Sequence, residues 1–262
     1  MAAPVFSTPF QPYVYQSPQS DVVPFQILGG EAQIVQIMLK SQDKVTAKPG
    51  SMCYMSGSIE MENIHLPEQE AGMWQWVFGK SVKSITFSNP GPNDGFVGIA
   101  APSPARILPI DLANFGGEIL CQPDAFLCSI KDVTVSSTVD PRVRNIVNNP
   151  EGVLRQKLVG QGLAFLTAGG SVVQKTLDAG EVLAVDIYCI LAATSTIDIQ
   201  GENIVTAVIT GPGVVFIQSL PFQRLSQRIA RQVTAPNMRE NPKFLIQIAK
   251  FSLEIIRMFF TL

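Results

Sequence analysis

The sequence predicts a mostly β protein, built from three related units and followed by an amphipathic C-terminal helix. Apolar and polar residues alternate along many short segments between Phe25 and Leu220, a pattern typical of half-buried strands. Clusters of Gly, Pro, Asn and Asp separate these segments as turns do. The same order of turn, strand and glycine-led strand occurs three times. We therefore expect one three-repeat β domain over residues 25–220.

The first 24 residues differ in composition from the β domain. They contain five prolines and no Lys, Arg or Glu. They lack the basic start of a secretory signal and the arginines of a mitochondrial presequence. We expect residues 1–24 to form an extended or disordered arm. Its aromatic residues offer a way to dock on a neighbour: Phe6, Phe10, Tyr13 and Tyr15.

The segment Gln33–Lys40 gives a clear strand signal, with Val35, Ile37 and Leu39 on one face and Met38 on the other. Further segments rich in Val, Ile, Thr and Phe predict strands up to residue 220. They include SVKSITF, ARILPI, LAFLT, SVVQKTL and EVLAVDIYCILAA. No helix of ten or more residues is expected in this stretch.

The repeat is defined by three turns, at offsets of 74 and 56 residues: Pro49-Gly50, Pro123-Asp124 and Ala179-Gly180. A glycine-led strand follows each turn, which aligns Val97, Leu163 and Val214. The units span about 25–112, 113–171 and 172–220. Units that bury little apolar surface alone are stabilised by their neighbours. Three of them most simply close around a pseudo-threefold axis, which hides sheet edges.

The first unit is the longest because it contains an insert, residues 66–82, with both tryptophans, Trp74 and Trp76. The insert is interpreted as a lid on the core; the alternative is an exposed patch that contacts a partner.

The residues after the β domain form a basic tail, 221–262, with seven Lys or Arg and two Glu. The net charge of −2 therefore hides an acidic body, which disfavours nucleic-acid binding. From Lys243 onward the polar residues form one narrow helical stripe: Lys243, Gln247, Lys250, Glu254, Arg257 and Thr261. This helix packs on protein or lies on a membrane surface through its apolar face and Lys243, Lys250 and Arg257. A membrane-spanning helix is disfavoured by its charges.

Residues for catalysis or metal binding are few. The single histidine, His65, excludes a multi-histidine metal site, and the cysteines form no C-x-x-C pair. Cys53 and Cys128 lie in apolar runs and are interpreted as small hydrophobes. No Gly-x-Ser-x-Gly or phosphate-loop motif is present. We expect no catalytic, cofactor-binding or metal-binding residue, and no enzyme.

Several segments together resemble one protein family: GKSVKSITF, GFVGIAAPSPARILPIDL, GGEILCQPDAFLCS, LVGQGLAFLTAGGSVVQKTLDAGEVLAVD and VITGPGVVFIQSL. It is the altered inheritance of mitochondria 24 family, whose β fold is similar to that of the tryptophan RNA-binding attenuation protein. The resemblance implies a β-prism or double-stranded β-helix body of three repeats, often in oligomers. It also implies a mitochondrial location and a role in inner-membrane organisation and respiratory-complex biogenesis, with no known enzymatic activity.

The sequence thus favours a non-enzymatic scaffold or assembly protein that contacts other proteins or its own subunits. A homo-oligomer is expected, most simply a trimer, with peripheral membrane contact through the C-terminal helix. The alternatives are a module on the β body that binds a small ligand or RNA, and an enzyme of unknown chemistry. A cytoplasmic location is the alternative to the mitochondrion.

Overall fold

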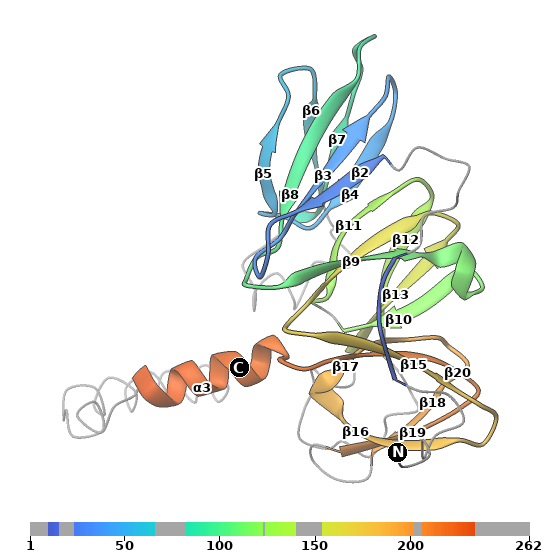
Figure 1. Ribbon diagram of the computed structural model, residues 1–262. Coiled ribbons are helices and arrows are strands. Elements are labelled where there is room, and N and C mark those ends of the chain that lie inside the picture. Colours follow the sequence, from blue (N-terminus) through green and yellow to red (C-terminus); the bar gives the residue numbers. More distant parts are fainter. Residues whose placement is uncertain are drawn as a thin grey trace, which may run out of the picture. The chain divides into compact units, whose positions relative to one another are not determined.

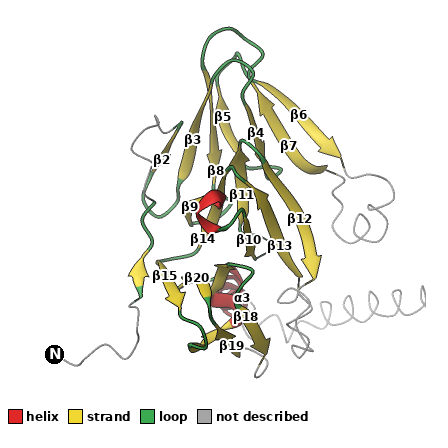
Figure 2. Ribbon diagram, turned by 90° about the vertical axis from the view of Figure 1, so that its right-hand side faces the viewer, coloured by secondary structure: helices red, strands yellow, loops and turns green. Residues whose placement is uncertain are grey.

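The computed structural model describes residues 10–15, 24–65, 82–122, 124–139, 154–201 and 206–233. The chain divides into two compact units, Met1–Pro221 and Phe222–Leu262. In Figure 2 the described part of the first unit consists almost entirely of strands and loops, so the mostly β prediction is confirmed.

The strands of the first unit fall into three sets of six, preceded by two strands of the N-terminal region. The preceding strands are β1 (Gln11–Pro12) and β2 (Phe25–Leu28). The first set is β3 (Ile34–Leu39), β4 (Lys44–Ala47), β5 (Met52–Met55), β6 (Glu60–His65), β7 (Val82–Ser88) and β8 (Gly95–Ala100).

The second set is β9 (Arg106–Asp111), β10 (Glu118–Cys121), β11 (Phe126–Ile130), β12 (Val133–Val139), β13 (Leu154–Gly160) and β14 (Leu163–Ala168). The third set is β15 (Val172–Leu177), β16 (Val182–Asp186), β17 (Ile190–Ala193), β18 (Asp198–Gly201), β19 (Thr206–Thr210) and β20 (Gly213–Gln218). Two short 3₁₀ helices interrupt them, η1 (Leu112–Phe115) and η2 (Ile187–Cys189). Figure 1 shows the three sets following one another through the first unit in chain order.

All three sets follow one antiparallel pairing scheme. The first strand of each set pairs with the sixth, as β3 does with β8. The second pairs with the fifth, the third with the sixth and the fourth with the fifth. In each set the ladder between the third and sixth strands contains a register shift.

Neighbouring sets join through the second strand of one and the third strand of the next. β4 pairs with β11, and β10 pairs with β17. The resulting sheets have seven, six, three and four strands, and none of them closes into a barrel. The described strands therefore do not form the closed body expected from the sequence, and the prism arrangement stays a prediction.

The turn alignment differs from the ladders in the third set. The turn at Pro49-Gly50 precedes β5, and the turn ending at Ala125 precedes β11, and these strands hold the same place in the scheme. Ala179-Gly180 instead precedes β16, which holds the place of β4 and β10. The counterpart of β5 is β17, which follows η2. The chain turns there through η2, which the Asp186 carboxylate caps by accepting a hydrogen bond from the Tyr188 amide at 3.0 Å. No Pro or Gly therefore marks this position in the sequence.

The predicted strand EVLAVDIYCILAA is for the same reason two strands, β16 and β17, with η2 between them. The alternation in β3 is confirmed: Val35, Ile37 and Leu39 are buried and Met38 is exposed. Buried apolar side chains form three clusters, one centred on each set. The clusters share strands, since Leu127 and Phe165 of the second set lie in the first cluster.

The second unit contains one described helix, α3 (Phe222–Val233). Arg224, Arg228 and Arg231 lie on one side of it, whereas Phe222 and Ile229 are apolar and more than half exposed. α3 lies within the tail that the sequence predicts to be helical. Among the described residues, no helix combines the length and the apolar character needed to cross a membrane.

Candidate functional site

Residues Phe10–Tyr15, here called the arm, lie against the β body. β1 pairs with β15, placing Gln11 opposite Gln174 and Pro12 opposite Val173. The Tyr13 hydroxyl donates a hydrogen bond to the Pro109 carbonyl of β9 at 2.5 Å. This part of the N-terminal region is therefore extended and docked on its own chain. Of the extended or disordered arm that the sequence predicts, these residues are extended, with Tyr13 and Tyr15 half-buried against the body.

Aromatic edge contacts fix the arm in place. The Tyr13 ring packs edge-on against Phe216 with centroids 5.1 Å apart. The Tyr15 ring contacts Phe25 of β2 at 5.6 Å, and Phe25 in turn packs edge-on against Phe165 at 4.9 Å. Such pairs add about 0.5–1.5 kcal/mol beyond the burial of their surface. The arm thereby packs against the first and second apolar clusters.

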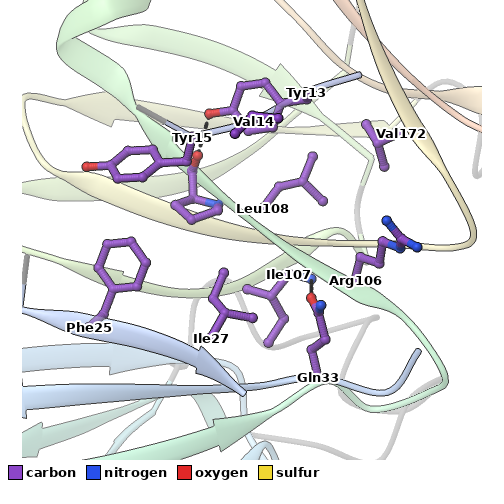
Figure 3. A pocket seen from close by; sticks show the side chains of 11 residues that line it. Tyr13, Val14, Tyr15, Phe25, Ile27, Gln33, Arg106, Ile107, Leu108 and Val172 are labelled. Atoms are coloured by element: carbon purple, nitrogen blue, oxygen red, sulfur yellow. Dashed lines mark hydrogen bonds between the residues drawn. The ribbon is translucent and has the colours of Figure 1, made fainter. Parts of the chain in front are cut away.

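A cavity of about 360 Å³ lies between the arm, β2 and β9. Figure 3 shows Tyr13, Val14 and Tyr15 on one side of it, Phe25, Ile27 and Gln33 on the other, and Leu108 between them. Its walls are mainly apolar and aromatic, as is typical of pockets that bind small molecules. The complete lining is Tyr13, Val14, Tyr15, Phe25, Ile27, Gln33, Arg106, Ile107, Leu108, Pro109 and Val172.

The polar side chains at one end of the cavity contact other groups of the protein. The Gln33 Oε1 accepts a hydrogen bond from the Ile107 amide at 2.7 Å. The Arg106 guanidinium lies 3.7 Å from the Glu31 carboxylate, and both side chains are largely exposed. An exposed pair of this kind contributes little to stability.

Both tyrosines are held in the neutral phenol form. Burial raises the pKa of Tyr13 far above its ordinary value, and the nearby Tyr15 and Asp111 raise it further. The pKa of Tyr15 is raised by burial and by Asp111 as well. A phenol in this state donates or accepts hydrogen bonds but is a poor base or nucleophile. The cavity is thus suited to binding more than to proton transfer.

A second polar feature is the buried ion pair between Lys175 of β15 and Glu181. The Lys175 side chain is fully buried, and its Nζ donates to Glu181 Oε1 at 2.7 Å and to the Thr176 carbonyl at 2.8 Å. Glu181 Oε2 accepts from the Asp178 amide at 2.9 Å. The pair therefore fixes the turn between β15 and β16, and we assign it a structural role.

The site residues predicted from the sequence lie outside the described residues: Trp74, Trp76, Lys243, Lys250 and Arg257. Within the described ranges, no three His, Cys, Asp or Glu side chains gather in a way that could hold a metal ion. The docking of Tyr13 and Tyr15 on their own chain was missed, since a proline-rich stretch carries no strand pattern. Lys175 was missed because only its inward register position in β15, beside buried Leu177, marks it as buried.

The cysteines differ in their surroundings. Cys128 is fully buried, and burial raises the pKa of its thiol well above the ordinary value. Cys53 is exposed, against the sequence-based interpretation. The register shift between Met52 and Tyr54 in the β5 ladder lies at this residue and explains the difference.

The β domain matches a known protein family. The family model described as mitochondrial biogenesis AIM24 matches residues 25–220, three quarters of the chain. The chain belongs to the AIM24 family. Membership implies a role related to mitochondrial biogenesis, and the family name points to an association with mitochondria.

A solved structure supports the architecture of this AIM24 protein. Protein SPYM3_0169 from Streptococcus pyogenes is similar with a TM-score of 0.62 and 22% sequence identity. The match covers 79% of this chain and 98% of the bacterial chain. At this identity the likeness concerns the fold alone. No curated protein matches the sequence.

Proposed function

We propose that this AIM24 protein is a non-enzymatic scaffold that supports mitochondrial membrane organisation and respiratory-complex biogenesis. The observation that carries the proposal is the chain of β sets joined edge to edge, with strand edges at both ends. Strands with unpaired edges recruit further strands. In this proposal the three sets are pseudo-repeats of a β-prism, and the protein contacts copies of itself or other proteins through them.

Family membership supports the mitochondrial part of the proposal, and the basic tail supports the membrane part. α3 presents Arg224, Arg228 and Arg231 beside exposed apolar residues. Cationic residues next to an apolar face suit an anionic membrane surface. The family resemblance supports a scaffold over an enzyme.

The test is to delete the gene in its source organism and to quantify assembled respiratory complexes on native gels. We expect fewer assembled complexes with unchanged amounts of their individual subunit transcripts. Carbonate extraction of the tagged protein should release it from the mitochondrial membrane as a peripheral protein. Normal complex levels in the deletion strain would contradict the proposal.

A second function, binding of a small molecule, is favoured by the cavity under the arm. Its apolar walls and the Arg106 guanidinium suit an aromatic or acyl ligand with an anionic group. Arg106→Gln should weaken binding of such a ligand, whereas Lys44→Gln, at an exposed lysine of β4 outside the cavity lining, should not. Equal affinity of the two variants in calorimetry would exclude the cavity as the site.

A further inference from the structure

In the pairing scheme, β16 is the second strand of the third set and β5 is the third strand of the first set. Within the part of the chain that the structure describes, both lack the junction partner that their counterparts in other sets have. β4 and β10 each pair with the third strand of the next set. Among the strands that the structure describes, β16 pairs only with β19, and β5 pairs only with β8. β16 ends one sheet and β5 ends another. The two edges therefore belong to the two kinds of strand that meet in each existing junction.

The existing junctions fix where the residues of the third would lie. After the register shift, Tyr54, Cys128 and Ala192 are equivalent, since each is the first paired residue of its ladder. Cys128 lies opposite Ala47, and Ala192 lies opposite Cys121. In the first two sets, the junction residue of the second strand precedes the equivalent residue of the third strand in the same set by seven positions. Ala47 thus precedes Tyr54, and Cys121 precedes Cys128.

The same spacing selects Val185 in β16, because it precedes Ala192 by seven positions. Val185 is buried, as are Ala47 and Cys121. The next pair in both junctions, Ser129 with Thr46 and Ala193 with Leu120, corresponds to Met55 with Ala184. Position by position, Val185 and Ala184 of β16 thus correspond to the junction residues of β4 and β10.

Backbone hydrogen bonds repeat across the two existing junctions as well. The Lys48 amide donates to the Leu127 carbonyl at 2.8 Å, and the Gln122 amide donates to the Leu191 carbonyl at 3.0 Å. The side chains that follow the second strand also cross the junction. Lys48 Nζ lies 2.9 Å from Asp124, and Gln122 Nε2 donates to the Tyr188 carbonyl at 2.8 Å.

Exposed apolar side chains mark both edges. On β5, Met52 and Met55 are 38% and 37% exposed. On β16, Val182 is 58% exposed and Ala184 is exposed. Apolar residues in exposed edge strands favour pairing with another chain. Figure 1 shows β5 and β16 in the first and last sets of the unit, with the middle set between them.

We infer that β16 of one copy pairs antiparallel with β5 of a second copy, with Met55 opposite Ala184 and Tyr54 opposite Val185. The contact is head-to-tail, so each copy binds two others and the assembly is a ring or a filament. This inference rests on the homo-oligomer part of the proposed function and on none of its mitochondrial part.

Cysteine cross-linking between two different variants of the full chain tests the contact. Both variants carry Cys53→Ser, and one adds Met55→Cys while the other adds Ala184→Cys. Directly opposite residues of an antiparallel pair have Cα atoms roughly 4.5–5.5 Å apart, within the range for a disulfide. We expect a disulfide-linked dimer in the mixture and none with either variant alone. Linkage of the Met55→Cys variant to itself would indicate pairing of β5 with β5 and would overturn the inference.

A register control uses Val182→Cys, which lies two residues away on the same strand and face. The inferred register predicts several-fold less linkage to Met55→Cys than Ala184→Cys gives. Equal linkage of both variants, or none with either, contradicts it.

Charge substitution tests the same contact without a cross-link. Met55→Lys with Ala184→Lys places like charges opposite each other, and light scattering should show monomers. Met55→Lys with Ala184→Glu should assemble as the unaltered chain does, and circular dichroism checks that both variants fold. Unaltered assembly of the double-lysine variant, or a monomeric unaltered chain at tens of micromolar, would sink the inference. The amount of assembled respiratory complexes is measured in a separate experiment. The inferred contact and the mitochondrial part of the proposed function are therefore able to fail independently.

Discussion

At the scale of single residues, the buried ion pair of Lys175 and Glu181 shows how one position sets a turn. A charged amine enters a protein core only when its hydrogen bonds are satisfied. Here Glu181 and the Thr176 carbonyl accept them, and Glu181 also accepts from the Asp178 amide. The side chain thus holds the end of β15 to the start of β16.

Removal of one partner should therefore cost far more than removal of both. We expect Glu181→Ala to lower the free energy of unfolding by about 3–5 kcal/mol, because it leaves the Lys175 ammonium buried without its carboxylate. Lys175→Met combined with Glu181→Leu should recover most of this loss. Urea denaturation of the three chains measures both changes. A Glu181→Ala variant as stable as the unaltered protein would show that the pair does not hold the turn.

The thiols give a second residue-scale prediction. Cys53 is exposed, whereas Cys128 is buried and its pKa is raised by burial. Since the thiolate is the reactive form, iodoacetamide at neutral pH should alkylate Cys53 first. Cys128 should react only in denaturant. Mass spectrometry of peptides after timed alkylation measures the order, and equal rates in the folded protein would contradict the burial.

At the scale of elements, the arm is held by few contacts, which makes its contribution measurable. Tyr13→Ala removes the hydrogen bond to Pro109 and the edge contact with Phe216. We expect a loss of about 1–3 kcal/mol and faster proteolysis of the N-terminal region. Val14→Ala is the matched control, since Val14 is 72% exposed, and it should change stability little. Equal melting temperatures for the two variants would mean that the arm is not docked in solution.

The tail gives a prediction that depends on its sequence pattern alone. If the helix from Lys243 lies on an anionic membrane, each basic residue contributes about 1 kcal/mol near the surface. Changing Lys243, Lys250 and Arg257 to Gln should then weaken liposome binding roughly a hundredfold. Co-sedimentation compares this variant with the intact chain and with a truncation after Leu220. An intact chain that stays free of liposomes, with a truncation that loses its oligomeric state, would make the tail an assembly element instead.

The sequence predicted elements better than the order in which they pair. Period-two alternation located β3, and segments rich in Val, Ile, Thr and Phe located β7, β9 and β14, since both patterns reflect local burial. They did not place the third turn, because η2 replaces a Pro/Gly turn with an Asp-capped one. They also gave no sign of the cavity, whose walls come from the arm, β2 and β9. Contacts between segments far apart in the chain leave no periodic trace in a single sequence.

At the scale of the whole molecule, shared core residues should make the first unit unfold as one. Phe165 of β14 is fully buried among side chains of the first set, and Phe216 of β20 lies in the cluster of the second. Such sharing couples the stability of neighbouring sets.

Phe165→Ala should therefore lower the single melting transition of the entire β body, at a cost of about 3–5 kcal/mol. Phe96→Ala in β8, a partly exposed phenylalanine, should shift it much less. Calorimetry of both variants measures the effect. Two separate transitions, only one of them moved by Phe165→Ala, would show that the sets are independent.

The docking of the arm also constrains when it folds during synthesis. Gln11 leaves the ribosome early, but its partner Gln174 lies in the third set, and the Tyr13 hydroxyl waits for Pro109. Because domains emerge at roughly 5–20 residues per second, the arm stays unpaired for many seconds after it appears. Docking on β15 and β9 therefore has to follow the synthesis of both strands, which makes it a late step in the folding of the first unit.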